Sequence, residues 1–175
     1  RDRYLSVSLD IVDEMNQIVL EILSLSSVQE LAGDKEWIQL DQVLEQILDQ
    51  YKVLAQSRTL TIDNQIPDKA VYMDPAILKL VLSNVISNAV KHSDAGGEIQ
   101  LRLEEEGTHL AVENTSQEMV ETAEMPMTAS RQKKEGGLGL FVVQHLLDHE
   151  ELAYQFDKTA MGLRFRMELP KEPQE

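Results

Sequence analysis

The chain has 175 residues, 42% of them hydrophobic and 27% charged, which is ordinary for one globular domain and excludes whole-chain disorder and fibrous repeats. Sixteen Lys and Arg against 31 Asp and Glu give a formal net charge of −15, which disfavours nucleic acid and anionic membrane surfaces as partners. The absence of Cys excludes disulfides, thiolate metal sites and thiol chemistry.

The first 32 residues are predicted to form a long helix that packs into a bundle. Residues 4–31 contain neither Gly nor Pro, which allows one continuous helix. Apolar residues beside its heptad seam widen the apolar face of this helix, which favours a dimeric bundle over a helix folded back on its own domain. A polar break at residues 32–35 predicts a boundary between a unit at residues 1–32 and a domain at residues 33–175. The heptad seam consists of Ile11, Met15, Ile18, Ile22 and Leu25.

Three further helices are predicted from their start signals and apolar spacing. Asp41 is expected to be the N-cap of a helix that runs to about Ser57. Asp74 followed by Pro75 predicts a second helix, to about residue 91, because Pro fits the first helical position. The third is expected at about residues 138–149.

The segments between these helices are predicted as strands and one long loop. Residues 99–103 and 110–112 alternate apolar and polar side chains around a turn at residues 106–108, which predicts a hairpin. Residues 115–136 show no sustained periodicity, so we expect a loop of a length typical of functional loops. Short extended segments are also expected near residues 37–40, 60–64, 70–72, 152–156 and 163–169.

Two polar side chains on the second of these helices suit metal chemistry. Asn84 and Asn88 lie four residues apart on one helical face, and Lys91 follows about a turn later. Amide oxygens suit a hard cation such as Mg²⁺, which takes its remaining ligands from water and phosphate. Hydrogen bonding of both amides to the backbone of a neighbouring strand is the alternative.

A glycine-rich segment, residues 131–140, is the second feature with chemical meaning. Gly137 and Gly139 open a predicted helix, and Arg131 and Lys133 lie just before them. Backbone N–H groups of closely spaced glycines at the positive end of a helix bind anions, so this is where the acidic chain favours phosphate. The alternative is a hinge with a solvated basic turn.

Taken together and in this order, these segments resemble the ATP-binding domain of sensor histidine kinases, within the larger class of gyrase-like ATPases. Residues 84–91 resemble the family's N box, residues 137–140 its second glycine box, and residues 162–165 the Gly-x-x-Phe near its end. Residues 15–26 resemble the second helix of the dimerisation and phosphotransfer hairpin. The implied fold is an α/β two-layer sandwich of the Bergerat type, with a mixed, mainly antiparallel sheet and about three helices, preceded by a long dimerising helix.

The resemblance implies ATP and Mg²⁺ as ligands and a role for each matching residue. Asn88, with Asn84, would coordinate Mg²⁺ between the phosphates, and Lys91 would contact a phosphate. His92 would lie beside the nucleotide, unless it is only an exposed residue at the helix end. Asn114 stands where the family's Asp accepts a hydrogen bond from adenine, which an amide oxygen can also accept. The ATP lid and its end would contribute Arg131, Lys133, Gly137, Leu138, Gly139 and Leu140.

Several positions depart from the family pattern. Ser116 and Glu118 replace glycines that follow the adenine-contacting residue, so we expect a stiffer or less tightly closed lid. Leu163 replaces a Thr that is common near adenine, which removes a polar contact. Leu80 stands where ATP-hydrolysing relatives carry a Glu that activates water, which argues against a gyrase-like ATPase.

The implied function is phosphorylation of a His by ATP, followed by transfer to an Asp in the receiver domain of a response regulator. His109, His145 and His149 lack the family's His-Glu/Asp-x-x-Thr-Pro context, so the acceptor is expected on the upstream helix that this chain lacks. We therefore expect a fragment that binds nucleotide but does not phosphorylate itself.

The same resemblance implies the partners and the location of the protein. The expected partners are a response regulator, the protein's own dimerisation and phosphotransfer helices and a second copy in a homodimer, but no nucleic acid. A membrane is expected only through missing upstream segments, as for the cytoplasmic domain of a membrane-bound sensor kinase. The alternatives are a degenerate, non-catalytic module for dimerisation or partner binding on the same fold, and a gyrase-like ATPase.

Overall fold

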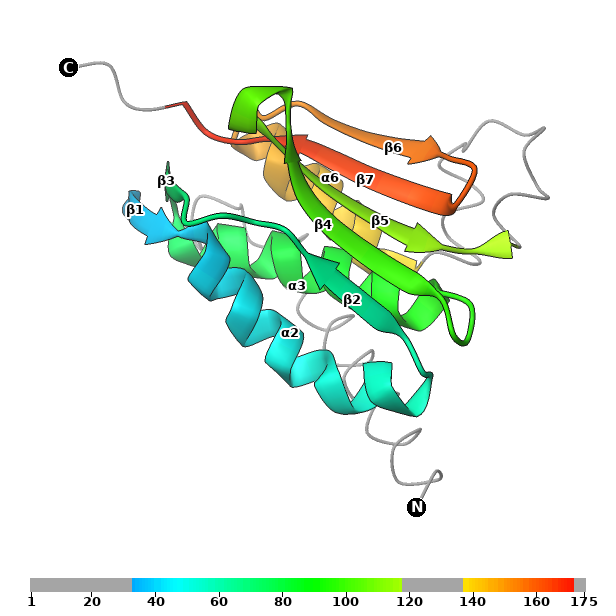
Figure 1. Cartoon of the computed structure of the whole chain (residues 1–175). Helices are drawn as coiled ribbons and strands as arrows, with labels where there is room; N and C mark the ends of the chain where they lie inside the picture. The colour runs from blue at the N-terminus through cyan, green and yellow to red at the C-terminus, as the bar shows by residue number, and fades with distance from the viewer. Residues whose placement is uncertain (1–32, 118–136, 172–175) are drawn as a thin grey trace.

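The computed structural model describes residues 33–117 and 137–171, which form two layers with a sheet on one side and helices on the other (Figure 1). The helices are α2 (Leu40–Ser57), α3 (Pro75–His92) and α6 (Gly137–His149), with a short 3₁₀ turn η2 (Glu105–Gly107). The strands are β1 (Glu36–Gln39), β2 (Thr61–Asn64), β3 (Ala70–Met73), β4 (Glu98–Glu104), β5 (His109–Thr115), β6 (Tyr154–Lys158) and β7 (Gly162–Glu168). The predictions for residues 1–32, for most of the long loop, and for Glu118, Arg131 and Lys133 lie outside the described residues.

The main sheet has five strands in the order β2-β4-β5-β7-β6. β2 runs parallel to β4, and the other neighbouring strands of this sheet are antiparallel. β4 and β5 form the predicted hairpin, whose turn is η2 with positive φ at Glu106 and Gly107. β1 and β3 form a separate antiparallel pair at one end of the molecule (Figure 1). The predicted mixed, mainly antiparallel sheet with three helices is therefore confirmed for the described residues.

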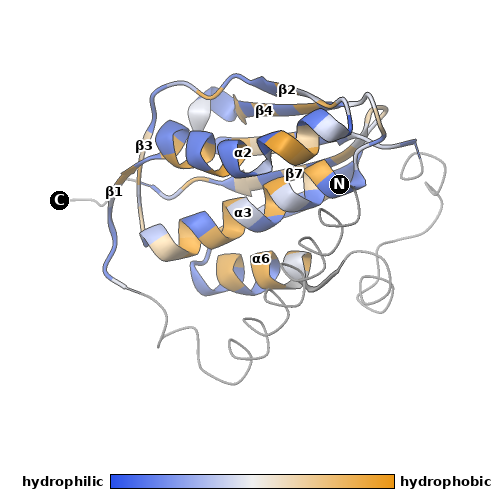
Figure 2. Ribbon diagram, turned by 90° about the horizontal axis from the view of Figure 1, so that it is seen from below, coloured by the Kyte–Doolittle hydropathy of each residue, from blue (hydrophilic) through white to orange (hydrophobic). Residues whose placement is uncertain are grey.

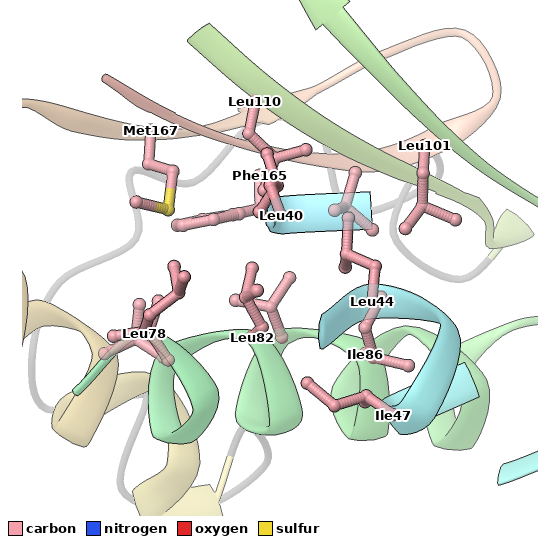
Figure 3. Packing of buried hydrophobic residues seen from close by; sticks show 14 of the residues in the cluster. Leu40, Leu44, Ile47, Leu78, Leu82, Ile86, Leu101, Leu110, Phe165 and Met167 are labelled. Carbon is pink, nitrogen blue, oxygen red and sulfur yellow. The ribbon is translucent and has the colours of Figure 1, made fainter. Parts of the chain in front are cut away.

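The core lies between the inner face of the sheet and the three helices. α3 lies between α2 and α6 (Figure 2) and also packs on β5, so it is buried on several sides. Apolar side chains of α2 and α3 point towards those of β4, β5 and β7 (Figure 3). Each fully buried Leu or Ile contributes about 1.5–3 kcal/mol. The labelled core residues are Leu40, Leu44, Ile47, Leu78, Leu82, Ile86, Leu101, Leu110, Phe165 and Met167.

The starts of α3 and α2 test the two predicted helix caps. Asp74 caps α3 as predicted, because its Oδ1 accepts from the N–H groups of Ala76 at 2.7 Å and Ile77 at 3.2 Å. The prediction that Asp41 caps α2 is wrong, because the helix begins at Leu40. Leu40 is fully buried and its N–H donates to the Lys69 carbonyl at 2.8 Å, so core packing decides where this helix begins.

The contact between α3 and α6 depends on the absence of a side chain at Gly139. A Cβ placed there would lie 2.9 Å from Oδ1 of Asn84, whose side chain is buried against α6. The amide of Asn84 cannot swing away freely, because its Nδ2 donates to the Leu80 carbonyl at 2.8 Å, one turn earlier in α3. Gly139 therefore lets the two helices approach over a buried amide.

The outer face of the sheet carries a network of charged side chains centred on Glu113 of β5. Its Oε2 accepts from Arg102 of β4 at 2.9 Å, and its Oε1 accepts from the Thr159 hydroxyl at 2.5 Å. Burial raises the pKa of the Glu113 carboxyl, but the hydrogen bonds from Thr159 and Arg102 and the charges of Arg102 and Arg164 outweigh burial and hold it below its usual value. The network thus fixes the outward side of the strand next to Asn114.

The Gly139→Ala substitution tests the helix contact. We expect overpacking to lower the free energy of unfolding by about 1–3 kcal/mol. Without the clash, Ala in place of Gly inside a helix would raise it by about 1 kcal/mol. Urea denaturation measures the change. In the double variant Asn84→Ala/Gly139→Ala the clash is absent, so a coupling of at least about 0.5 kcal/mol is expected. Strictly additive single changes would contradict this contact.

The Glu113→Gln substitution tests the outer network through pH. A folded-state pKa below the usual 4.5 means that the stabilisation is complete above pH 4.5 and is lost as the pH falls through the folded-state value. We expect the variant to be less stable by about 1–3 kcal/mol at pH 7, with a difference that shrinks at pH 3.5. Denaturation at both pH values measures it. Glu45→Gln on the exposed side of α2 is the control, and a difference independent of pH would refute the assignment.

Candidate functional site

A pocket opens between the helix layer and the inner face of the sheet. Its walls are mostly apolar and include two side-chain amides, a composition typical of small-molecule sites. α3, α6, β5, β6 and β7 all contribute, so the pocket exists only in the folded domain. Its lining residues are Val85, Asn88, Ala89, Val112, Asn114, Leu140, Phe156, Leu163 and Phe165.

Asn114 is the most deeply placed polar group of this pocket. It is only 4% exposed and stands opposite Ile99 of β4 on one side and Leu163 of β7 on the other, neither of which offers a polar side-chain atom. Its Nδ2 has no hydrogen-bond partner among the described residues. A buried N–H left unpaired costs about 1–3 kcal/mol, so a ligand that presents an acceptor to it would recover that cost.

The backbone around Asn114 is held in place from three sides. Gly162 of β7 lies so close that a Cβ there would overlap the Asn114 carbonyl and the Ser116 N–H. The Ser116 N–H donates to the Met161 carbonyl at 3.0 Å, and the Thr115 carbonyl accepts from the N–H of Asp94 at 2.9 Å. The Gly-x-x-Phe motif thus begins with a glycine whose role is close strand packing beside the pocket.

The structure separates the two asparagines of α3. Asn88 is half-buried and lines the pocket, one turn after Asn84. Asn84 is not among the lining residues, because its amide nitrogen bonds to the Leu80 carbonyl and its oxygen packs against Gly139. The pocket therefore brings together Asn88 and Asn114, whereas Asn84 bonds to a carbonyl of its own helix and not to a neighbouring strand.

Lys91 and His92 lie at the C-terminal end of α3, beyond the pocket lining. Lys91 is half-buried and His92 is exposed. Arg58, which follows α2, holds this helix end because its guanidinium donates to the carbonyls of Lys91 and Ser93, each at 2.5 Å. Two of the carbonyls at the end of α3 are satisfied in this way. A lone Arg after a helix carries no sequence signal for this role.

The last four residues of the predicted glycine-rich segment, residues 137–140, form the start of α6. Gly137 and Leu138 are the first residues of this helix, and Leu140 contributes to the pocket. The apolar residues of the pocket wall could not be predicted as site residues from the sequence. Val85, Ala89 and Phe165, for example, follow the same periodicity as ordinary core positions. Phe156 packs against Phe165 at 5.1 Å between ring centroids with the rings tilted by 45°, and both residues line the pocket.

The donor set limits which metal this part of the chain could hold. Among the described residues there is no group of three or more His, Cys, Asp or Glu side chains arranged to bind a metal ion. An amide oxygen such as that of Asn88 fits a cation that also takes water and phosphate as ligands, which is the habit of Mg²⁺. None of the helices in the described ranges is both long and apolar enough to cross a bilayer.

Comparison with known proteins places this chain in a family. Residues 73–173 match the family described as histidine kinase-, DNA gyrase B-, and HSP90-like ATPase. The sensor histidine protein kinase HK06 of Streptococcus pneumoniae is 31% identical over 176 residues, which cover 95% of this chain and 39% of that protein. The chain thus spans about two-fifths of the length of this relative.

Two solved structures show the same fold at lower identity. The catalytic domain of the histidine kinase ThkA is 20% identical with a TM-score of 0.64, covering 81% of this chain and all of that domain. A histidine kinase ThkA solved in complex with the response regulator protein TrrA is 18% identical with a TM-score of 0.65, covering 97% of this chain and 51% of that one. With the family match, the pocket and the sheet order, these likenesses identify the chain as a member of the histidine kinase-, DNA gyrase B- and HSP90-like ATPases, in the form of the ATP-binding domain of a sensor histidine kinase.

Proposed function

We propose that the pocket between α3, α6 and the sheet binds ATP together with Mg²⁺ and presents its γ-phosphoryl group to a His on another helix. The observation that carries this is the buried, unpaired amide of Asn114 at the base of an apolar pocket that also exposes Asn88. A purine base is flat and apolar on its faces and polar at its edge. Apolar walls with one polar group at the base suit such a ligand.

The residues of the chain take distinct roles in this proposal. Asn114 receives the edge of the base, and Val85, Ala89, Phe156 and Leu163 enclose it and exclude water. Asn88 offers its amide oxygen to the metal, which when bound neutralises charge on the phosphates. Asn84, also expected as a metal ligand from the sequence, supports this arrangement through its contact with α6, since its nitrogen donates to the Leu80 carbonyl and its oxygen lies against Gly139.

The phosphate end of the site is proposed to involve the residues beyond the pocket. Lys91 and His92 stand at the end of α3, one turn after Asn88, where a triphosphate leaving the pocket along this helix would pass. Arg131, Lys133, Gly137 and Leu138 are proposed to contact the phosphates as well, as the family resemblance implies. No covalent group of this domain is required, because phosphoryl transfer depends on positioning and on stabilisation of charge.

The acceptor and the partners belong to the whole protein. ThkA was solved with a response regulator, and we propose an equivalent partner here, together with a homodimer through the upstream hairpin. The acceptor His is proposed to lie on a helix before residue 1, so the chain alone would bind nucleotide without phosphorylating itself. A cytoplasmic position in a membrane-bound sensor kinase follows from the same proposal.

A non-catalytic module on the same fold is the second candidate. It is favoured by Leu163, which stands directly opposite Asn114 and offers no polar atom to a base. Saturable binding of ATP separates the two candidates, since a degenerate module would show none. Steady release of phosphate by the purified chain would instead favour a gyrase-like ATPase.

The Asn88→Ala substitution tests the metal role. We expect the affinity for ATP in the presence of Mg²⁺ to fall by at least about tenfold, because the loss of even an outer-shell partner weakens a metal site by that much. Binding in EDTA should stay unchanged. Calorimetric titration with and without Mg²⁺ measures both. Asn64→Ala on β2, an exposed position, is the control. An equal loss with and without the metal would assign Asn88 to the nucleotide rather than to Mg²⁺.

A further inference from the structure

The amide of Asn114 can serve as both donor and acceptor at the base of the pocket. Its nitrogen is buried without a partner among the described residues. Its cross-strand neighbours, Ile99 and Leu163, carry no polar side-chain atom that would hold the amide in one orientation. A carboxylate at this position could only accept hydrogen bonds, whereas an amide presents one donor beside one acceptor.

This donor and acceptor pair matches the polar edges of two kinds of purine. Adenine presents an amino donor beside the ring acceptor N1. A 6-oxopurine such as hypoxanthine presents the reverse, a carbonyl acceptor beside the donor N1–H. Rotation of the amide by half a turn about its terminal bond exchanges Oδ1 and Nδ2, so one asparagine can pair with either edge. At position 6 of the ring, a carboxylate accepts from the amino group of adenine but meets the carbonyl of a 6-oxopurine acceptor to acceptor, whereas an amide can turn either its oxygen or its nitrogen to that position.

We propose that Asn114 makes this site accept 6-oxopurine nucleotides as well as adenine nucleotides. The inference rests on the proposed function, because it concerns which base the same pocket takes. Substrate choice then depends on one side chain, whose unpaired nitrogen is satisfied by N1 of adenine or by the carbonyl of hypoxanthine. Correct pairing at two adjacent atoms discriminates between bases by about tenfold or more, so an asparagine that pairs with both removes that preference.

Titration calorimetry with ATP and with ITP tests this, using the full 175-residue chain and Mg²⁺. ITP carries hypoxanthine and lacks the 2-amino group of guanine, so it changes only the edge that Asn114 reads. The variant Asn114→Asp replaces the amide by a carboxylate of the same shape. Asn64→Asp is the matched control, since Asn64 is exposed on β2 and its Oδ1 accepts from the Ile66 N–H at 3.2 Å, which a carboxylate can also do.

For the unchanged chain we expect the two dissociation constants to agree within about tenfold. In Asn114→Asp the ratio of the ITP constant to the ATP constant should rise at least about tenfold, and in Asn64→Asp it should stay as in the unchanged chain. Circular dichroism checks that each variant is folded. If Asn114→Asp does not fold, the ratio for the unchanged chain decides alone.

Each other outcome overturns a defined statement. Binding of ATP with a preference over ITP beyond about tenfold in the unchanged chain overturns the inference and leaves the proposed function standing. If a folded Asn114→Asp variant keeps the same ratio of the ITP constant to the ATP constant as the unchanged chain, the inference is also overturned and the proposed function stands, because residue 114 then does not contact the edge of the base. Absence of saturable binding by both nucleotides overturns the proposed function, and the inference with it.

Discussion

The burial of α3 on several sides is the constraint on which the site depends. This helix lies between α2 and α6 and beneath the sheet, so its sequence is apolar around most of its circumference (Figure 2). A polar residue on a buried face of such a helix needs a hydrogen-bond partner or access to the pocket. Asn84 does the first, against Gly139, and Asn88 does the second one turn later.

In β5 as well, neighbouring polar residues differ in whether the protein itself satisfies their hydrogen bonds. Its side chains alternate between the two faces, so Glu113 points outward and Asn114 inward. Glu113 is tied to Arg102 and Thr159, which leaves its polar atoms satisfied within the protein. Asn114 meets only apolar neighbours across the strands. One residue of the pair therefore supports the fold, and the nitrogen of the next is left unpaired by the described residues at the pocket.

The sequence predicted those parts of the fold that local chemistry decides. The cap at Asp74, the hairpin of β4 and β5, and the inward row Leu163, Phe165 and Met167 all follow from side-chain type and spacing over a few residues. The parallel pairing of β2 with β4 could not be predicted, since it joins segments separated by α3. Asp41 was a favourable cap by composition, but the burial of Leu40 decided the start of α2.

The site was predictable in its polar residues and not in its walls. Asn88 stands out because an amide is unusual on an apolar helix, and Asn114 was indicated only by the family resemblance; both line the pocket. Spacing alone could not separate Asn84 from Asn88, because the difference arises from the approach of α6. Apolar wall residues such as Phe156 carry no signal that distinguishes a pocket from a core.

The hydrogen bonds of Arg58 connect the end of α2 to the end of α3. Its planar guanidinium holds the carbonyls of Lys91 and Ser93 at once, although it belongs to the chain that leaves α2. A displacement of the end of α2 must therefore carry Lys91 and Ser93 with it or break both bonds together. The ends of the two helices are thus joined by one side chain directly at the backbone of Lys91.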